Sequence, residues 1–163
     1  MSEHGVEIGT SEFRRVMGHF CTGIVIITAQ IDGRPMGLTC QSFVSVSLNP
    51  PLVSFCPGHS STSWPTMRQA GKFCVNVLAA DQQPLCESFA ASGGDKFKDV
   101  SWTTTENGSP RIDGCLAHID CTLEATYEAG DHDIVVGRVQ DLIVSRSSTP
   151  LLFYQGQFES LSN

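Results

Sequence analysis

The sequence lacks the features of a membrane or nucleic-acid-binding protein. No apolar run approaches the roughly 20 residues of a membrane span, and the opening stretch, MSEHGVEIGT, carries neither a basic segment nor an apolar core. We therefore expect no secretory signal, no membrane association and a cytoplasmic protein. The 10 Lys and Arg residues are scattered among 17 Asp and Glu, which gives a formal net charge of −7. Since nucleic-acid binding requires a clustered basic surface, we expect no nucleic-acid partner.

Several catalytic and metal-binding motifs are also missing. The sequence contains no G-x-G-x-x-G, no P-loop and no G-x-S-x-G motif, so a Rossmann site, a P-loop and a nucleophile elbow are not predicted. Its 7 cysteines include no C-x-x-C pair, which excludes the usual zinc spacing, and we expect no metal. The odd number of cysteines favours reduced thiols, and the apolar contexts of Cys74 and Cys121 predict buried ones.

What the sequence does contain is typical of one globular domain. Its 163 residues are 40% hydrophobic, enough for a single core without disulfide staples. We expect one domain over residues 1–163, with residues 1–10 flexible. A helix is predicted over Glu12–Phe20, begun by Thr10 or Ser11 as N-cap. Its apolar residues share one face at the spacing i, i+3, i+4, i+7. They are Phe13, Val16, Met17 and Phe20.

Most of the remaining chain reads as β-strands joined by short turns. An Asp32-Gly33 pair between two β-forming runs predicts a hairpin. Short helices are predicted over Ser61–Ala70, with Gly71 as its stop, and over Asp81–Ala91, capped by Asp81. Further strands are predicted over Leu52–Cys56, Phe73–Leu78, Ile134–Val144 and Pro150–Tyr154. This pattern favours a mainly β protein with a closed or partly closed barrel over a doubly wound parallel sheet.

The clearest strand runs over residues 119–127. Its odd-numbered residues are mostly apolar and its even-numbered ones polar, so the odd set is predicted to face the core and the even set water. The turn GDHD then leads into Ile134–Val144, the expected partner strand. We interpret Asp131 and Asp133 as turn-forming residues, whereas His132 between them is either ordinary turn chemistry or a ligand contact.

Two polar segments are candidate binding elements. GLTCQSF (residues 37–43) offers donors and acceptors that suit the edge of a planar heterocycle, or is simply a polar loop. GHSSTSW (residues 58–64) places four hydroxyls at a predicted helix start, which favours phosphate binding or simply caps the helix. No catalytic serine is predicted, because the G-x-S-x-G motif is missing. No catalytic cysteine is predicted either, because no cysteine lies in an electropositive setting.

Taken together, these segments resemble the flavin reductase-like family with an FMN-binding split barrel. The resemblance is closest to the reductase components of two-component flavin-dependent monooxygenases, including those that serve aromatic hydroxylases and halogenases. It covers about residues 13–158 and implies a split β-barrel, Greek-key-like, with a few short flanking helices. The matching segments, in order, are FRRVMGHFCTGIVIITA, GLTCQSFVSVSLNPPLVSFC, SSTSW, GKFCVNVL, DKF, GDHDIVVGRV and PLLFYQGQF.

The resemblance implies a set of flavin-binding residues. Four of them would line the isoalloxazine edge, where the family commonly carries T-A-N-S: Thr39, Cys40, Gln41 and Ser42. Two would lie near the ribityl chain, Phe55 and Cys56. Four would lie at or near the phosphate: Ser61, Ser63, Lys96 and Phe97. Tyr154 would face the flavin, and Gln155 stands where the family usually has arginine.

The resemblance also implies a reaction. His132 would pack against the nicotinamide and position it over the flavin, which makes it the candidate catalytic residue. Hydride would pass from NADH, with NADPH less favoured, to FAD or FMN, and reduced flavin would diffuse to a partner monooxygenase. The family further implies a homodimer with flavin near its interface. Two other functions stay open: a flavin- or haem-binding split barrel without redox activity, and a pyridoxamine-phosphate-oxidase-like enzyme.

Overall fold

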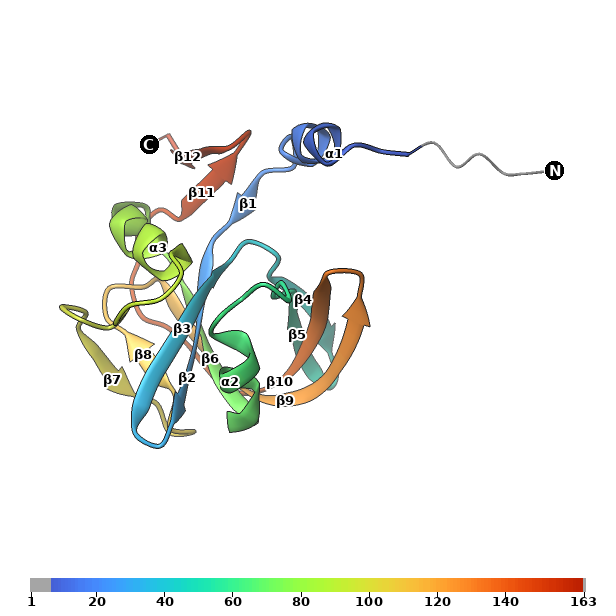
Figure 1. Ribbon diagram of the computed structural model, residues 1–163. Helices are drawn as coiled ribbons and strands as arrows, with labels where there is room; N and C mark the ends of the chain where they lie inside the picture. Colours follow the sequence, from blue (N-terminus) through green and yellow to red (C-terminus); the bar gives the residue numbers. More distant parts are fainter. Residues whose placement is uncertain (1–6, 163) are drawn as a thin grey trace.

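A curled antiparallel sheet forms the body of the protein in the computed structural model, which describes residues 7–162 (Figure 1). Its seven strands lie in the order β3-β2-β6-β9-β10-β5-β4, and two small sheets flank it, β1-β11-β12 and β7-β8. The strands are β1 (Thr22–Gly23), β2 (Val25–Ile31), β3 (Arg34–Cys40), β4 (Val44–Leu48), β5 (Pro51–Phe55), β6 (Lys72–Val77), β7 (Trp102–Thr104), β8 (Pro110–Ile112), β9 (Ala117–Ala129), β10 (His132–Val144), β11 (Leu151–Tyr154) and β12 (Gln157–Ser160).

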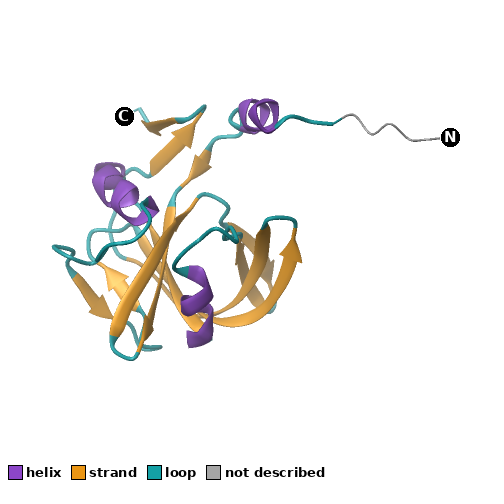
Figure 2. Ribbon diagram, viewed as in Figure 1, coloured by secondary structure: helices purple, strands orange, loops and turns teal. Residues whose placement is uncertain are grey.

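Three short α-helices lie outside the sheet, as Figure 2 shows. They are α1 (Thr10–Met17), α2 (Trp64–Met67) and α3 (Gln83–Ala90); the 3-10 turns η1 (Arg68–Ala70) and η2 (Ala80–Gln82) adjoin the last two. The predicted mainly β fold is therefore confirmed. No helix in residues 7–162 is both long and apolar enough to cross a membrane. The predicted flexible segment 1–10 lies largely outside the described residues, and its last residue, Thr10, begins α1.

The predicted hairpin is present, with β2 and β3 paired around the turn at Asp32-Gly33. Both turn residues have positive φ, 49° and 77°, as the tight hairpin turn of matching twist requires. The long strands β9 and β10 pair along their whole lengths, from His132 opposite Ala129 to Val144 opposite Ala117. The turn between them therefore sets His132 at the first position of β10.

Two buried apolar clusters lie on opposite faces of β2. Alternate residues of a strand point to opposite sides, so Val25 and Ile27 enter the cluster inside the barrel while Ile24 and Ile26 enter a second one. That second cluster lies against α3 and includes Phe89 and the buried end of β11. Because the first part of β2 is covered on both faces, residues 24–27 are continuously apolar rather than alternating.

The predicted alternation along β9 is only partly correct. Cys121 is fully buried as predicted, but Asp120 is also buried, and Tyr127 is 60% exposed. The neighbouring His118 bonds through Nε2 to the Ile112 carbonyl of β8, at 2.7 Å, so β8 covers this part of the predicted solvent face. Tyr127 lies near the far end of the β9–β10 hairpin, where no other element covers it.

The predicted helices exist, but their starts differ. Helix α1 begins after Gly9 as N-cap, without a side-chain cap from Thr10 or Ser11. The helix predicted from Ser61 begins only at Trp64, because the Ser61 hydroxyl accepts the Trp64 backbone N–H at 3.1 Å. Asp81 does not cap α3, which begins at Gln83, and instead pairs with Arg146 at 2.7 Å.

Candidate functional site

The main cavity opens where the ends of β3, β5 and α3 meet the start of β10. Its volume is about 530 Å³. Its wall consists of residues 38–42 at the end of β3 and just after it, residues 56–58 and 60–62 after β5, residues 89–92 at the end of α3, Lys96 and His132. Segments that are distant in the sequence therefore meet here. The volume of the cavity lies within the range typical of small-ligand sites.

The β3 side of the cavity is held by hydroxyl groups. The Thr39 hydroxyl donates to the Cys86 carbonyl of α3 at 2.9 Å. The Ser42 hydroxyl accepts the Cys56 backbone N–H at 2.8 Å, which joins the chain after β3 to the chain after β5. Gln41 is exposed, and its Oε1 accepts the Thr22 hydroxyl at 3.4 Å. These bonds give the edge of the cavity a defined shape.

The Cys40 thiol of the cavity is a poor candidate for nucleophilic catalysis. Cys40 is buried, and that burial raises the pKa of its thiol to about 12. A thiol with such a pKa stays protonated at neutral pH and is a weak nucleophile. The predicted burial of Cys74 and Cys121 is confirmed as well, and burial raises the pKa of both thiols. In residues 7–162 no group of three or more His, Cys, Asp or Glu side chains could hold a metal.

Three hydroxyl residues after β5, Ser60, Ser61 and Thr62, line the cavity and are called the hydroxyl segment. Ser61 has a second role, because its oxygen accepts the backbone N–H groups of Ser63 and Trp64 at 3.3 and 3.1 Å. Its hydroxyl hydrogen remains available as a donor. The hydroxyl segment therefore offers short polar side chains to a ligand, while the backbone N–H groups that follow it are already bonded to Ser61.

Lys96 is the only Lys or Arg among the described residues that line the cavity. Its Nζ donates to the Phe89 carbonyl at the end of α3, at 2.9 Å, and to the Gly37 carbonyl, at 3.3 Å. An ammonium has three N–H donors, so these two bonds leave one for a ligand. Burial lowers the pKa of Lys96 below its ordinary value. A charged, partly desolvated and fixed ammonium is a good partner for an anion.

His132 projects from the first position of β10 into the cavity wall. Its Nδ1 lies 2.7 Å from Oδ1 of Asp131, and this bond lowers the pKa of the Asp131 carboxyl. An ionised carboxylate can only accept, so Nδ1 donates and Nε2 is left free for a ligand. A Cβ at Gly58 would touch Nε2 at 3.4 Å, an ordinary van der Waals contact, so the glycine leaves that side of the ring uncovered.

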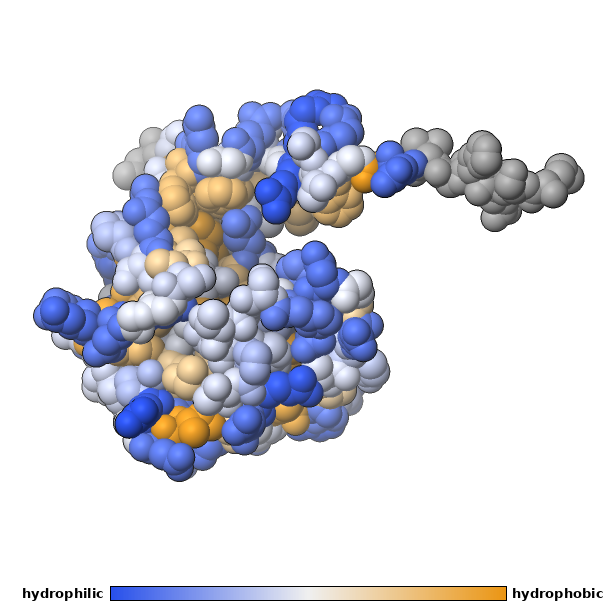
Figure 3. Space-filling model, in the orientation of Figure 1, coloured by the Kyte–Doolittle hydropathy of each residue, from blue (hydrophilic) through white to orange (hydrophobic). Residues whose placement is uncertain are grey.

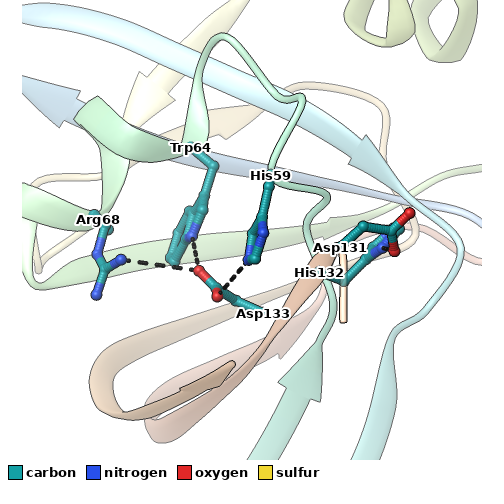
Figure 4. A network of polar contacts seen from close by, with 6 residues as sticks. All are labelled: His59, Trp64, Arg68, Asp131, His132 and Asp133. Carbon is teal, nitrogen blue, oxygen red and sulfur yellow. Dashed lines mark hydrogen bonds and ion pairs between the residues drawn. The ribbon is translucent and has the colours of Figure 1, made fainter. Parts of the chain in front are cut away.

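Behind His132, a second polar network joins the two walls of the cavity (Figure 4). Asp133 receives His59 Nε2 at 3.0 Å and Trp64 Nε1 at 3.3 Å, and Arg68 Nη1 lies at 3.8 Å. The sequence analysis missed this network and interpreted Asp133 as a turn former. No local pattern indicates it, because its partners are more than sixty positions away.

Four predicted flavin-site residues do not line the main cavity. Phe55 is fully buried and packs edge-on against Trp64 and Phe73. Tyr154 is absent from the cavity lining and places its ring 6.4 Å from that of His19. Ser63 and Phe97 line a neighbouring side cavity of about 300 Å³ instead. The other eight predicted residues do line the main cavity: Thr39, Cys40, Gln41, Ser42, Cys56, Ser61, Lys96 and His132.

A third cavity, the apolar groove, separates α1 from the barrel. Its volume is about 890 Å³, and its walls come from α1, β1, residues 41–44 and residues 153–156. Figure 3 shows apolar surface on the side of α1 that faces this hollow. Four apolar residues of the α1 region are between 52% and 73% exposed: Phe13, Val16, Met17 and Phe20. The predicted apolar face of the helix thus exists, and within residues 7–162 its side chains stay more than half exposed.

Comparison with known proteins agrees with the resemblance seen in the sequence. The family model "Flavin reductase like domain" matches residues 17–162. The chain is 49% identical over 154 residues to the flavin-dependent monooxygenase reductase subunit HsaB of Rhodococcus jostii. This alignment covers 94% of this chain and 79% of HsaB.

Two solved structures share the fold closely. The nitrilotriacetate monooxygenase component B homolog from Mycobacterium thermoresistibile has a TM-score of 0.91 and 46% identity, covering 93% of this chain and 86% of that one. The NADH:FAD oxidoreductase SgcE6 of Streptomyces globisporus, in complex with NAD and FAD fragments, has a TM-score of 0.86 and 35% identity, covering 93% and 92%. By sequence and by fold, the chain belongs to the flavin reductase-like family.

Proposed function

We propose that this chain is an NADH-dependent flavin reductase that supplies reduced flavin to a partner monooxygenase. The observation that carries the proposal is the main cavity, which gathers a polar edge from β3, a single lysine and a histidine with a free Nε2. These groups suit a flavin and a nicotinamide that meet face to face. The proposal keeps the cytoplasmic location expected from the sequence.

The residues of the main cavity fit a flavin. The ring would lie along Thr39–Ser42 and Cys56, whose backbone and side chains offer polar contacts at its edge. The phosphate would lie between the hydroxyl segment and Lys96, where three hydroxyls and a free ammonium N–H converge. When bound, flavin supplies the redox chemistry by accepting hydride from NADH.

The protein's own part in the reaction is to bind and align the two rings. His132 would contact the nicotinamide through its imidazole face or Nε2, while Asp131 fixes the orientation of the imidazole through Nδ1. Such positioning needs no protein nucleophile, which agrees with the raised pKa of the Cys40 thiol.

The side cavity favours FAD as a ligand alongside FMN. It shares Thr62 and Lys96 with the main cavity and continues past them to Gly93 and Gly94. A ligand whose phosphate lies at Lys96 could therefore extend its AMP half into the side cavity. FMN, which ends at this phosphate, would fill the main cavity alone.

The proposed reaction is tested by following the absorbance of NADH in the presence of the purified protein and FAD, FMN or neither. We expect NADH to be consumed only when flavin is added, and NADPH to be consumed more slowly. The same experiment without oxygen should accumulate reduced flavin. If neither donor is consumed in a flavin-dependent way, the reductase proposal fails, and a binding protein without redox activity becomes the better interpretation.

The proposal includes a homodimer. Helix α1 buries none of its residues against the part of the chain that the structure describes, although its apolar side is continuous with the apolar groove. Four neighbouring apolar side chains that are each more than half exposed are typical of an interface. The groove also shares Gln41 and Ser42 with the main cavity, so a second copy seated on it would lie next to the proposed flavin ring.

We expect light scattering after size-exclusion chromatography to give twice the mass of one chain. The double variant Phe13→Asp, Met17→Asp should give the mass of a single chain, because two buried carboxylates at an apolar interface are strongly unfavourable. Ser11→Asp, on the same helix, is the matched control and should leave the dimer intact. A wild-type protein with the mass of one chain would contradict this part of the proposal.

A further inference from the structure

Asp133 and His132 leave the start of β10 in opposite directions (Figure 4). Neighbouring side chains of a strand point to opposite faces, so His132 lines the main cavity while Asp133 points away from it. The residue Asp133 is only 8% exposed. A carboxylate buried to this degree is costly unless several donors surround it.

All the donors that reach Asp133 come from one short segment, residues 59–68. His59 and Trp64 bond to different carboxylate oxygens, at 3.0 and 3.3 Å, and Arg68 approaches the oxygen that Trp64 contacts. The bond from His59, followed by that from Trp64, lowers the pKa of the Asp133 carboxyl. The hydroxyl segment lies between His59 and Trp64 in the sequence, so these bonds hold both of its ends.

The backbone reinforces the same connection. The His59 N–H donates to the Asp131 carbonyl at 2.8 Å, and the Asp133 N–H donates to the Pro57 carbonyl at 3.0 Å. Gly58 therefore lies directly opposite His132 in an antiparallel bridge. Two backbone hydrogen bonds thus join residues 57–59, which lead into the hydroxyl segment, to residues 131–133, which include His132.

We propose that Asp133 is a positioning residue that holds His132 and the hydroxyl segment in register across the main cavity, acting through His59 and Trp64. The inference rests on the proposed function, because it assigns NADH to one side of this connection and the flavin phosphate to the other. Asp133 touches neither ligand. Its removal should loosen both sides of the cavity together, whereas a residue that contacts one ligand affects that ligand alone.

The test compares Asp133→Ala with the wild type by steady-state kinetics. We expect the KM for NADH and the KM for flavin each to rise about tenfold, because both sides of the cavity lose the connection that positions them; this factor corresponds to about 1.4 kcal/mol in each binding free energy. The Kd for flavin, measured without NADH by quenching of flavin fluorescence, should rise by a similar factor. Asp141→Asn, an exposed aspartate on the same strand, is the control and should change none of these values.

A purely structural role would lower the thermal unfolding midpoint and the fraction of active enzyme, and both KM values would stay at the wild-type level. That result would overturn the inference. His59→Ala covers the case in which Asp133→Ala does not fold, because His59 is partly exposed and its loss leaves Trp64 on the carboxylate. It should raise both KM values several-fold, and unchanged values would also overturn the inference.

The two proposals fail in distinguishable ways. If the wild type consumes no NADH with added flavin, the proposed function fails and the positioning role falls with it. If the wild type is active and both variants keep wild-type KM and Kd values, only the positioning role is wrong. Asp133→Asn retains one acceptor oxygen for His59 or Trp64, so it should fall between Asp133→Ala and the wild type in all three measurements.

Discussion

Replacing Lys96 with methionine is expected to raise the KM for FMN by about ten- to a hundredfold, while the KM for riboflavin changes by less than about twofold. Lys96 is the only cation among the described residues of the main cavity, and a charge-assisted bond to phosphate is stronger than a neutral one. Riboflavin has the same ring and ribityl chain but no phosphate. Steady-state kinetics with both flavins measures the difference directly.

Lys98→Met is the matched control, because it removes an equal charge two residues away from an exposed position. The comparison with riboflavin guards against a loss of structure, since Lys96 also bonds to Phe89 and Gly37. Equal increases in KM for FMN and riboflavin would show that Lys96 supports the fold rather than the phosphate. An unchanged KM for FMN would place the phosphate elsewhere.

The lowered pKa of Lys96 gives the same prediction a pH dependence. A lysine with a lowered pKa loses its charge as pH rises, and does so below the ordinary lysine value of about 10.4. The value of kcat/KM for FMN reports groups of the free enzyme. It should therefore decline on the alkaline side at a pH below that value, and the decline should be absent in Lys96→Met. A decline that persists in the variant would assign it to another group.

Replacing His132 with alanine is expected to raise the KM for NADH about tenfold and the KM for flavin by less than about twofold. The variant removes the ring that would face the nicotinamide and leaves the residues near the proposed flavin phosphate in place. His132→Gln keeps a polar donor at a similar distance and should recover part of the affinity for NADH. Steady-state kinetics at saturating concentrations of the second substrate separates the two KM values.

The outcome distinguishes two interpretations of His132. If neither KM changes, the residue only forms the turn before β10. If both KM values rise equally, it supports the cavity as a whole, as is proposed for Asp133. Only a selective rise in the KM for NADH supports a contact with the nicotinamide.

Local sequence was sufficient where the deciding forces are themselves local. The Asp32-Gly33 turn was predictable because few residue pairs adopt two successive positive φ values. Gly71 ends the second helical segment with a φ of 66°, as its sequence position predicted. The ordered set of family-like segments also named eight residues that line one cavity, including Lys96 and His132, although their role in binding stays a prediction.

Side-chain direction could not be predicted wherever a distant segment covers the strand. Phe55, which the resemblance places near the ribityl chain, is buried against Trp64 and Phe73, because the barrel interior lies on that side of β5. Asp120 was assigned to water and is buried near the β7–β8 sheet, which pairs 110–112 with 102–104. Periodicity reports that two faces differ, but which face is covered depends on contacts far along the chain.

The sequence by itself determined the mainly β class, the chief turns and the family, because propensity, turn chemistry and motif order are written in adjacent residues. Only the tertiary structure decided that His59, Trp64 and Arg68 surround Asp133, and that Lys96 bonds to the carbonyls of Phe89 and Gly37. These contacts join residues from separate elements. They form when the sheet curls and brings the ends of its strands together, a consequence of long-range packing that no local pattern encodes.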